Sequence, residues 1–79
     1  MSSTEREQMV RGMVERLAAR LSADGSDVEG WLRLMRAYMV LGEVGKARAA
    51  AAAARRALAT DPGKLRRIEE GAKNFGLDG

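Results

Sequence analysis

The chain of 79 residues contains no cysteine and no histidine. The sequence therefore excludes disulfide bonds, the usual structural zinc sites, and catalysis through a thiol or a Ser–His pair. It also lacks an apolar run of about 18 residues that could cross a membrane, and it contains no glycine-rich loop followed by lysine that could bind phosphate. These absences predict a segment with no catalytic residue, no metal ion, no other cofactor and no membrane contact.

Aromatic residues and proline are scarce, with one Trp, one Tyr, one Phe and one Pro. Charged residues are common instead: 14 Lys and Arg stand against 11 Asp and Glu, for a formal net charge of +3. This modest, interspersed excess predicts a soluble protein, and it forms no long basic stripe or recognition helix, so we expect no nucleic-acid partner. A chain of this length forms one small domain, residues 1–79, with a limited core.

The sequence predicts an all-α fold with no strand. Apolar residues recur at spacings of three and four in successive segments, which is the period of an amphipathic helix. Only short loops separate these segments, so neighbouring helices must run antiparallel. We expect four helices, at about residues 4–23, 27–41, 44–60 and 62–75.

Signals for the ends of helices set these bounds. Asp61 followed by Pro62 is a start signal, since an acceptor side chain precedes proline at the first helical position. Two further pairs have the spacing of a capping box, namely Thr4 with Glu7 and Ser26 with Glu29. Glycine can adopt the left-handed conformation that ends a helix, and the expected stops are Gly25, Gly42 and Gly76.

The apolar stripes of the four helices predict the hydrophobic core. Met13 and Met35 lie on these stripes, and we expect both to fill the core. Six consecutive alanines at 49–54 have high helix propensity and almost no bulk, which permits close packing. The remaining core residues that we expect are Leu17, Leu21, Trp31, Leu34, Tyr38, Leu41, Ala47, Leu58, Leu65, Ile68 and Phe75.

Residues 28–62 resemble one tetratricopeptide repeat (TPR), a pair of helices that stacks on its neighbours. The resemblance rests on Trp31, Leu34, Tyr38, Leu41, Gly42, Ala47, Ala57-Leu58 and Asp61-Pro62. Leu17 and Leu21 fit the second helix of a preceding repeat, and Ile68, Ala72 and Phe75 fit the first helix of a following one. The resemblance implies a TPR-like right-handed superhelical array, with one full repeat flanked by two half repeats.

Two positions depart from the TPR pattern. Met35 stands where the family prefers glycine or alanine, and the spacing from Trp31 to Pro62 is about three residues longer than usual. The longer spacing indicates that the helix at 44–60 is nearly one turn longer than usual. The alternative fold is a plain four-helix bundle whose pattern matches TPR by chance.

A narrower resemblance is to the TPR region of c-type cytochrome biogenesis proteins of the CcmI/CycH kind. It is carried by the phrases MVERLAARL, D-x-EGWLRL-x-RAYMVLG and KARAA. That family is anchored in the bacterial inner membrane with its TPRs in the periplasm, where they hold apocytochrome c, notably its C-terminal helix, for haem attachment. The resemblance implies a periplasmic domain of a membrane-anchored parent; without it, the compartment stays unknown.

The TPR resemblance also implies a peptide-binding groove, because the first helix of each pair lines the concave face. More cations than carboxylates on this face favour a peptide that is acidic or ends in a free carboxylate, which arginine can grip with two parallel hydrogen bonds. The alternative is that these are ordinary solvated helix faces. The groove residues would be Glu29, Leu32, Arg33, Arg36, Met39, Arg66, Glu69 and Lys73.

These observations favour a non-enzymatic, chaperone-like scaffold that binds a protein or peptide. By resemblance the partner is apocytochrome c or a subunit of a haem-lyase complex. The alternative is a generic TPR scaffold or a self-associating adaptor in a bacterial complex, with a homodimer formed through the helix at 4–23. A preceding first helix is missing from the array, which suggests a piece of a longer protein or a surface that another chain covers.

Overall fold

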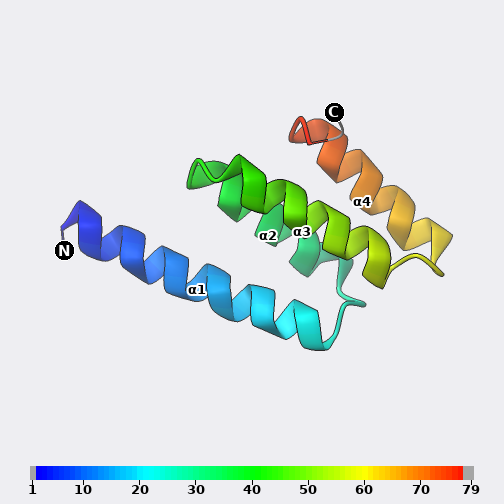
Figure 1. Ribbon diagram of the computed structural model, residues 1–79, viewed down its shortest axis with the longest axis horizontal. Helices are drawn as coiled ribbons and strands as arrows, with labels where there is room; N and C mark the ends of the chain where they lie inside the picture. The colour runs from blue at the N-terminus through cyan, green and yellow to red at the C-terminus, as the bar shows by residue number, and fades with distance from the viewer. Residues whose placement is uncertain (1, 78–79) are drawn as a thin grey trace.

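The computed structural model describes residues 2–77, and these residues form four helices and no strand. The helices are α1 (Ser3–Ala23), α2 (Val28–Val40), α3 (Val44–Ala57) and α4 (Pro62–Asn74), joined by short loops (Figure 1). The expected all-α, TPR-like fold class is confirmed. No helix within residues 2–77 has the length and apolar character needed to cross a membrane.

The first two helices begin with caps other than those expected. The capping box of α1 joins Ser2 to Glu5, whose backbone N–H donates to Ser2 Oγ at 3.1 Å, so Thr4 lies inside the helix. At α2 the cap is Asp27, and the Ser26 hydroxyl instead donates to Asp24 at 2.7 Å. In both places two acceptor side chains lie close together in sequence, so spacing alone cannot select the cap.

Helices α2 and α4 are built alike, at corresponding positions 34 residues apart. Each begins at an aspartate, Asp27 or Asp61, whose carboxylate accepts a hydrogen bond from the backbone N–H three residues on. Each ends before a glycine with positive φ, 73° at Gly42 and 75° at Gly76. The N–H after each glycine donates to the carbonyl five residues earlier, at 2.8 Å and 2.7 Å. The two helices therefore repeat one local design.

Helix α3 is shorter than the sequence indicates. It ends at Ala57 rather than near residue 60, and Leu58 to Thr60 form a turn closed by a 3.0 Å bond from the Asp61 N–H to the Leu58 carbonyl. The extra helical turn inferred from the spacing of Trp31 and Pro62 is therefore wrong. The additional residues between Trp31 and Pro62 belong to the turn that precedes Asp61, the N-cap of α4.

Helix α2 lies at the centre of the molecule and packs against α1, α3 and α4, while α3 also packs against α4 (Figure 1). Its core face meets the alanines of α3, which are too small to hold the two helices apart. Met35 of α2, which stands where TPRs prefer a small residue, is fully buried, and its Cε lies 4.0 Å from the position that a Cβ on Gly71 of α4 would take. The buried residues of α3 on this face are Ala47, Ala50, Ala51 and Ala54.

Most of the expected core residues lie in or against this core. Six are buried, namely Leu21, Trp31, Leu34, Ala47, Leu58 and Ile68. Four are half-buried against it, namely Leu17, Tyr38, Leu41 and Phe75. Leu65 is half-buried, and Val14, Ala72 and Leu77 are further buried residues. Met13 is a correction, because its side chain is 57% exposed.

Gly25 has a different role from the one expected. Among the described residues only Gly42 and Gly76 have positive φ, so Gly25 does not end α1 by a left-handed turn. Gly25 is instead required for its small size, because a Cβ at this position would overlap the Cβ of Ala57 in α3. Its carbonyl oxygen also accepts a 2.9 Å hydrogen bond from the Trp31 indole nitrogen. The loop before α2 is therefore clamped between α3 and the central tryptophan.

Candidate functional site

Two residues of the expected groove form the contact between α2 and α4. Glu29 of α2 makes an ion pair with Arg67 of α4. Leu32 packs against Gly71, where a Cβ would overlap the Leu32 Cδ2 atom. These side chains therefore hold the two helices together, and Leu32 is not an open groove position.

The other expected groove residues lie in different surroundings. Glu69 makes an ion pair with Arg55 of α3, and Met39 is half-buried against the core. Arg33 is exposed and lines the groove described below. Besides Arg33, three exposed cations of α2 and α4 make no ion pair with any residue in the range 2–77, namely Arg36, Arg66 and Lys73. They are the part of the expected set that remains available to a carboxylate.

A hollow between α2 and α4 lies at the N-terminal ends of the two helices. It has a volume of about 520 Å³, and its walls include both capping aspartates. Of the eight expected groove residues only Glu29 contributes to it, and the full lining is Ser26, Asp27, Val28, Glu29, Asp61, Gly63, Lys64 and Arg67.

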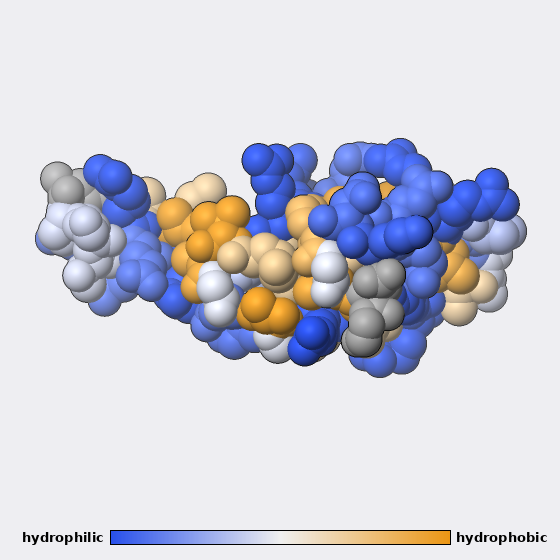
Figure 2. All heavy atoms as spheres, turned by 90° about the horizontal axis from the view of Figure 1, so that it is seen from above, coloured by the Kyte–Doolittle hydropathy of each residue, from blue (hydrophilic) through white to orange (hydrophobic). Residues whose placement is uncertain are grey.

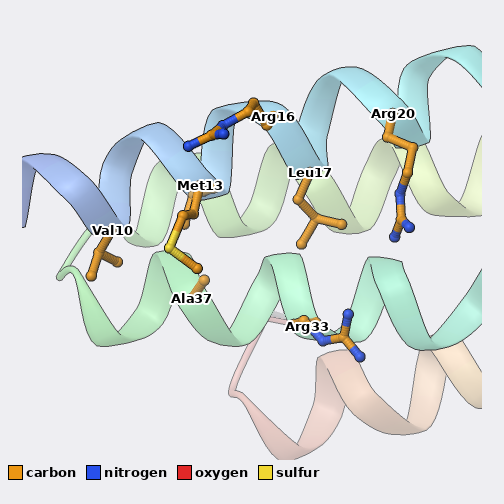
Figure 3. Close-up of a pocket in the computed structure, with 8 residues that line it drawn as sticks. Val10, Met13, Arg16, Leu17, Arg20, Arg33 and Ala37 are labelled. Atoms are coloured by element: carbon orange, nitrogen blue, oxygen red, sulfur yellow. The ribbon is translucent and has the colours of Figure 1, made fainter.

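The most apolar groove lies between α1 and α2 and has a volume of about 460 Å³. Val10, Met13 and Leu17 of α1 point toward α2 across it, and Ala37 forms part of the opposite wall (Figure 3). Arg16, Arg20 and Arg33 also line the groove, and none of its described lining residues carries a carboxylate. Figure 2 shows apolar surface between the hydrophilic N-terminal end and the middle of the molecule, with further apolar atoms at the opposite end.

The sequence predicts the apolar stripe of α1 but not this groove. α1 has 21 residues and α2 has 13, so the first half of α1 extends beyond the helix on which it packs. Met9 is 48% exposed for this reason, and residues 3–10 are exposed throughout. The signal in the sequence for this groove is the difference in length between the two expected helices, at 4–23 and 27–41.

An ion-pair network is centred on Arg11 of α1. The Arg11 guanidinium lies 2.9 Å from Glu7 of the same helix and 2.9 Å from Glu43 in the turn between α2 and α3. These two hydrogen-bonded carboxylates raise the pKa of Arg11. The hydrogen bond from Arg11 in turn lowers the pKa of Glu43 below its usual value. The network ties α1 to the far end of the α2–α3 hairpin.

At the opposite end of α1, Asp24 accepts hydrogen bonds from the side chain and backbone of Ser26, and these lower its pKa. Arg20 reaches from α1 to Asp27 at 3.1 Å. Among residues 2–77, no three carboxylates stand together in a way that could hold a metal ion. The side chains of the site are thus suited to binding through apolar contact and charge.

No family model matches the chain, and no solved structure matches it. Two curated proteins named cytochrome c-type biogenesis protein CycH are similar to all or nearly all of its length. The one from Bradyrhizobium diazoefficiens is 57% identical over 79 residues, which is 100% of this chain and 21% of that protein. The one from Rhizobium meliloti is 36% identical over 78 residues, 99% of this chain and 20% of that protein. The chain therefore spans about a fifth of the length of the curated relatives it matches.

Proposed function

We propose that this chain is a non-enzymatic, TPR-type interaction module that acts in c-type cytochrome maturation. Its role is to hold a peptide or C-terminal helix of a client such as apocytochrome c, with a haem-lyase complex subunit as the other partner to test. The observation that carries this proposal is the similarity to proteins named for cytochrome c-type biogenesis, which extends over the whole chain. By the same resemblance the module belongs to a membrane-anchored parent and works in the periplasm.

The exposed cations of α2 and α4 support a client with a carboxylate. Arg36, Arg66 and Lys73 have no anionic partner among the described residues, whereas Glu29 and Glu69 are already paired. A free C-terminal carboxylate would therefore find cations that lose no existing ion pair on binding it. Arginine can add a bidentate hydrogen bond to such a group.

A labelled peptide with the C-terminal sequence of an apocytochrome c, with a free carboxylate, tests the proposal by fluorescence anisotropy. We expect binding to the 79-residue chain, and Arg36→Glu should weaken it at least about tenfold by replacing attraction with repulsion. Arg48→Glu is the matched control, because Arg48 is an exposed, unpaired arginine of the described chain on α3. Its affinity should stay close to that of the wild type.

Amidating the peptide's C-terminus separates the carboxylate from the remaining sequence. The amidated peptide should bind the wild-type chain about as weakly as the peptide with a free carboxylate binds the Arg36→Glu variant. Equal affinity of both peptides for the wild type, or equal loss in Arg36→Glu and Arg48→Glu, would reject this binding face.

A further inference from the structure

The groove between α1 and α2 corresponds to a surface that is covered elsewhere in the same molecule. The 34-residue correspondence between α2 and α4 extends to the helices that precede them, which pairs α1 with α3. On α3 the buried face that receives α2 consists of Ala47, Ala50, Ala51 and Ala54. The residues 34 positions earlier are Met13, Arg16, Leu17 and Arg20, and all four line the groove. The face of α1 that lines the groove therefore corresponds to the face of α3 that α2 covers.

The wall of the groove that α2 forms also has a covered counterpart, which lies on α4. On α4 the residues that meet α2 include Arg67, which pairs with Glu29, and Gly71, which packs against Leu32. The residues 34 positions earlier are Arg33 and Ala37, and both line the groove. Both walls of the groove thus have covered counterparts, and in each case the cover is the same helix, α2.

We propose that the groove between α1 and α2 seats one amphipathic helix of a partner protein, lying beside α2 as α2 lies beside α4. The partner helix presents a carboxylate to Arg33 and, three residues on, an apolar side chain to Ala37. This arrangement repeats the contacts of Glu29 with Arg67 and of Leu32 with Gly71.

The side chains of the groove also define the size of the partner's residues. Ala37 carries a Cβ where Gly71 has none, and Met13 and Leu17 are larger than Ala47 and Ala51. A helix in the groove therefore has less room than α2 has on α3 and α4. Its apolar stripe must consist mainly of small residues such as alanine, with acidic residues on its flanks to meet the arginines.

Charge favours a partner helix over a second copy of the chain. A symmetric dimer through this groove would bring its own arginines, Arg16, Arg20 and Arg33, against the same residues of the other copy. The groove has no carboxylate to offset that repulsion. Of the three arginines only Arg20 has a carboxylate within the described chain, Asp27 at 3.1 Å. An acidic helix would add the missing partners.

The test uses a blocked helical peptide of about 16 residues with an alanine-rich apolar stripe and a Glu-x-x-Ala pair. A second peptide carries lysine in place of every glutamate and is otherwise identical. At low salt the acidic peptide should bind the 79-residue chain at least about tenfold more tightly than the basic one, measured by fluorescence anisotropy. Arg33→Glu should reverse this preference. Equal affinity for the two peptides would overturn the proposal.

A matched pair of substitutions locates the site. Val10→Glu places a charge in the groove, whereas Val44→Glu makes the same change 34 residues later on α3, at a valine of similar exposure outside the groove. We expect Val10→Glu to weaken the acidic peptide at least about tenfold and Val44→Glu to leave it unchanged, with both variants as helical as the wild type. An equal loss of peptide affinity in the two variants would overturn the assignment of the binding site to this groove.

Sedimentation velocity tests the competing occupant. A dimer of the 79-residue chain that Val10→Glu dissociates would assign this groove to a second copy and overturn the proposal. The proposal is independent of the apocytochrome client, because Arg36→Glu should affect the C-terminal peptide and leave the acidic helix bound. A failure of one proposal can therefore be told from a failure of the other.

Discussion

At the scale of single residues, two glycines have opposite surroundings. A Cβ at Gly25 would overlap the Cβ of Ala57, and that atom cannot rotate away because it is attached directly to the backbone of α3. A Cβ at Gly12, inside α1, would meet nothing within 4 Å. One glycine is thus needed for close packing, while the other only adds conformational freedom to the unfolded chain.

We predict that Gly25→Ala destabilises the protein by about 1–3 kcal/mol, because the loop and α3 must move apart. Gly12→Ala should stabilise it by about 0.5–1 kcal/mol, since alanine is the better helix former. Urea unfolding followed by circular dichroism measures both changes.

A double variant identifies the cause. Ala57→Gly removes the atom that Gly25→Ala would strike, so the combined variant should lose less stability than the sum of the two single losses. Strict additivity would show that Gly25 has some other role.

Residue type and periodicity predicted which side chains share a face, but not which faces have a partner. Trp31, Leu34 and Ile68 lie on stripes that meet a neighbouring helix, and they are buried. Met13 lies on an equally regular stripe and is exposed, because none of the helices within residues 2–77 covers that part of α1. The pattern of one helix holds no information on the length of the next.

At the scale of the helices, the sequence predicted the number, order and type of the elements, because start and stop signals depend on neighbouring residues. Asp61-Pro62, Gly42 and Gly76 mark the ends that they were expected to mark. The end of α3 was missed because alanine propagates a helix without stopping it, and the turn after Ala57 depends on packing. The contacts between helices were beyond sequence reasoning, as the pairing of Glu29 with Arg67 illustrates.

The ion pair between Arg11 and Glu43 links α1 to the α2–α3 turn and makes stability depend on pH. The pKa of Glu43 is lowered in the folded protein, so its carboxylate stabilises the fold above its ordinary pKa of about 4.5. That contribution is lost as the pH falls through the lower folded-state value. We predict that Glu43→Gln is less stable than the wild type at pH 7 and that the difference disappears at low pH.

Urea midpoints at pH 7 and at successively lower pH values measure this convergence. Glu70→Gln serves as the control, because Glu70 is exposed on α4 and forms no ion pair with other described residues. A Glu43→Gln curve that runs parallel to the wild type at every pH would contradict the proposed link.

At the scale of the whole molecule, the core lies to one side of a flat, elongated body measuring 43 × 27 × 16 Å. α2 is enclosed by three helices, whereas the N-terminal half of α1 extends past them (Figure 1). Residues 3–10 contribute no buried side chain, and Val14 and Leu21 are the buried residues of α1. The free energy of local opening should therefore fall along α1 toward its N-terminus.

Native-state hydrogen exchange tests this gradient directly. We predict the strongest protection in α2 and α3, where opening requires exposure of the core around Trp31 and Ala51. Amides at residues 7–11 should exchange at least about tenfold faster than those at 18–23, because helix without tertiary contacts is only marginally stable. Adding the acidic helical peptide should slow exchange across the middle of α1, since the bound helix packs on Met13 and Leu17 and opening then requires its release. Uniform protection along α1 in the free protein would contradict this distribution of stability.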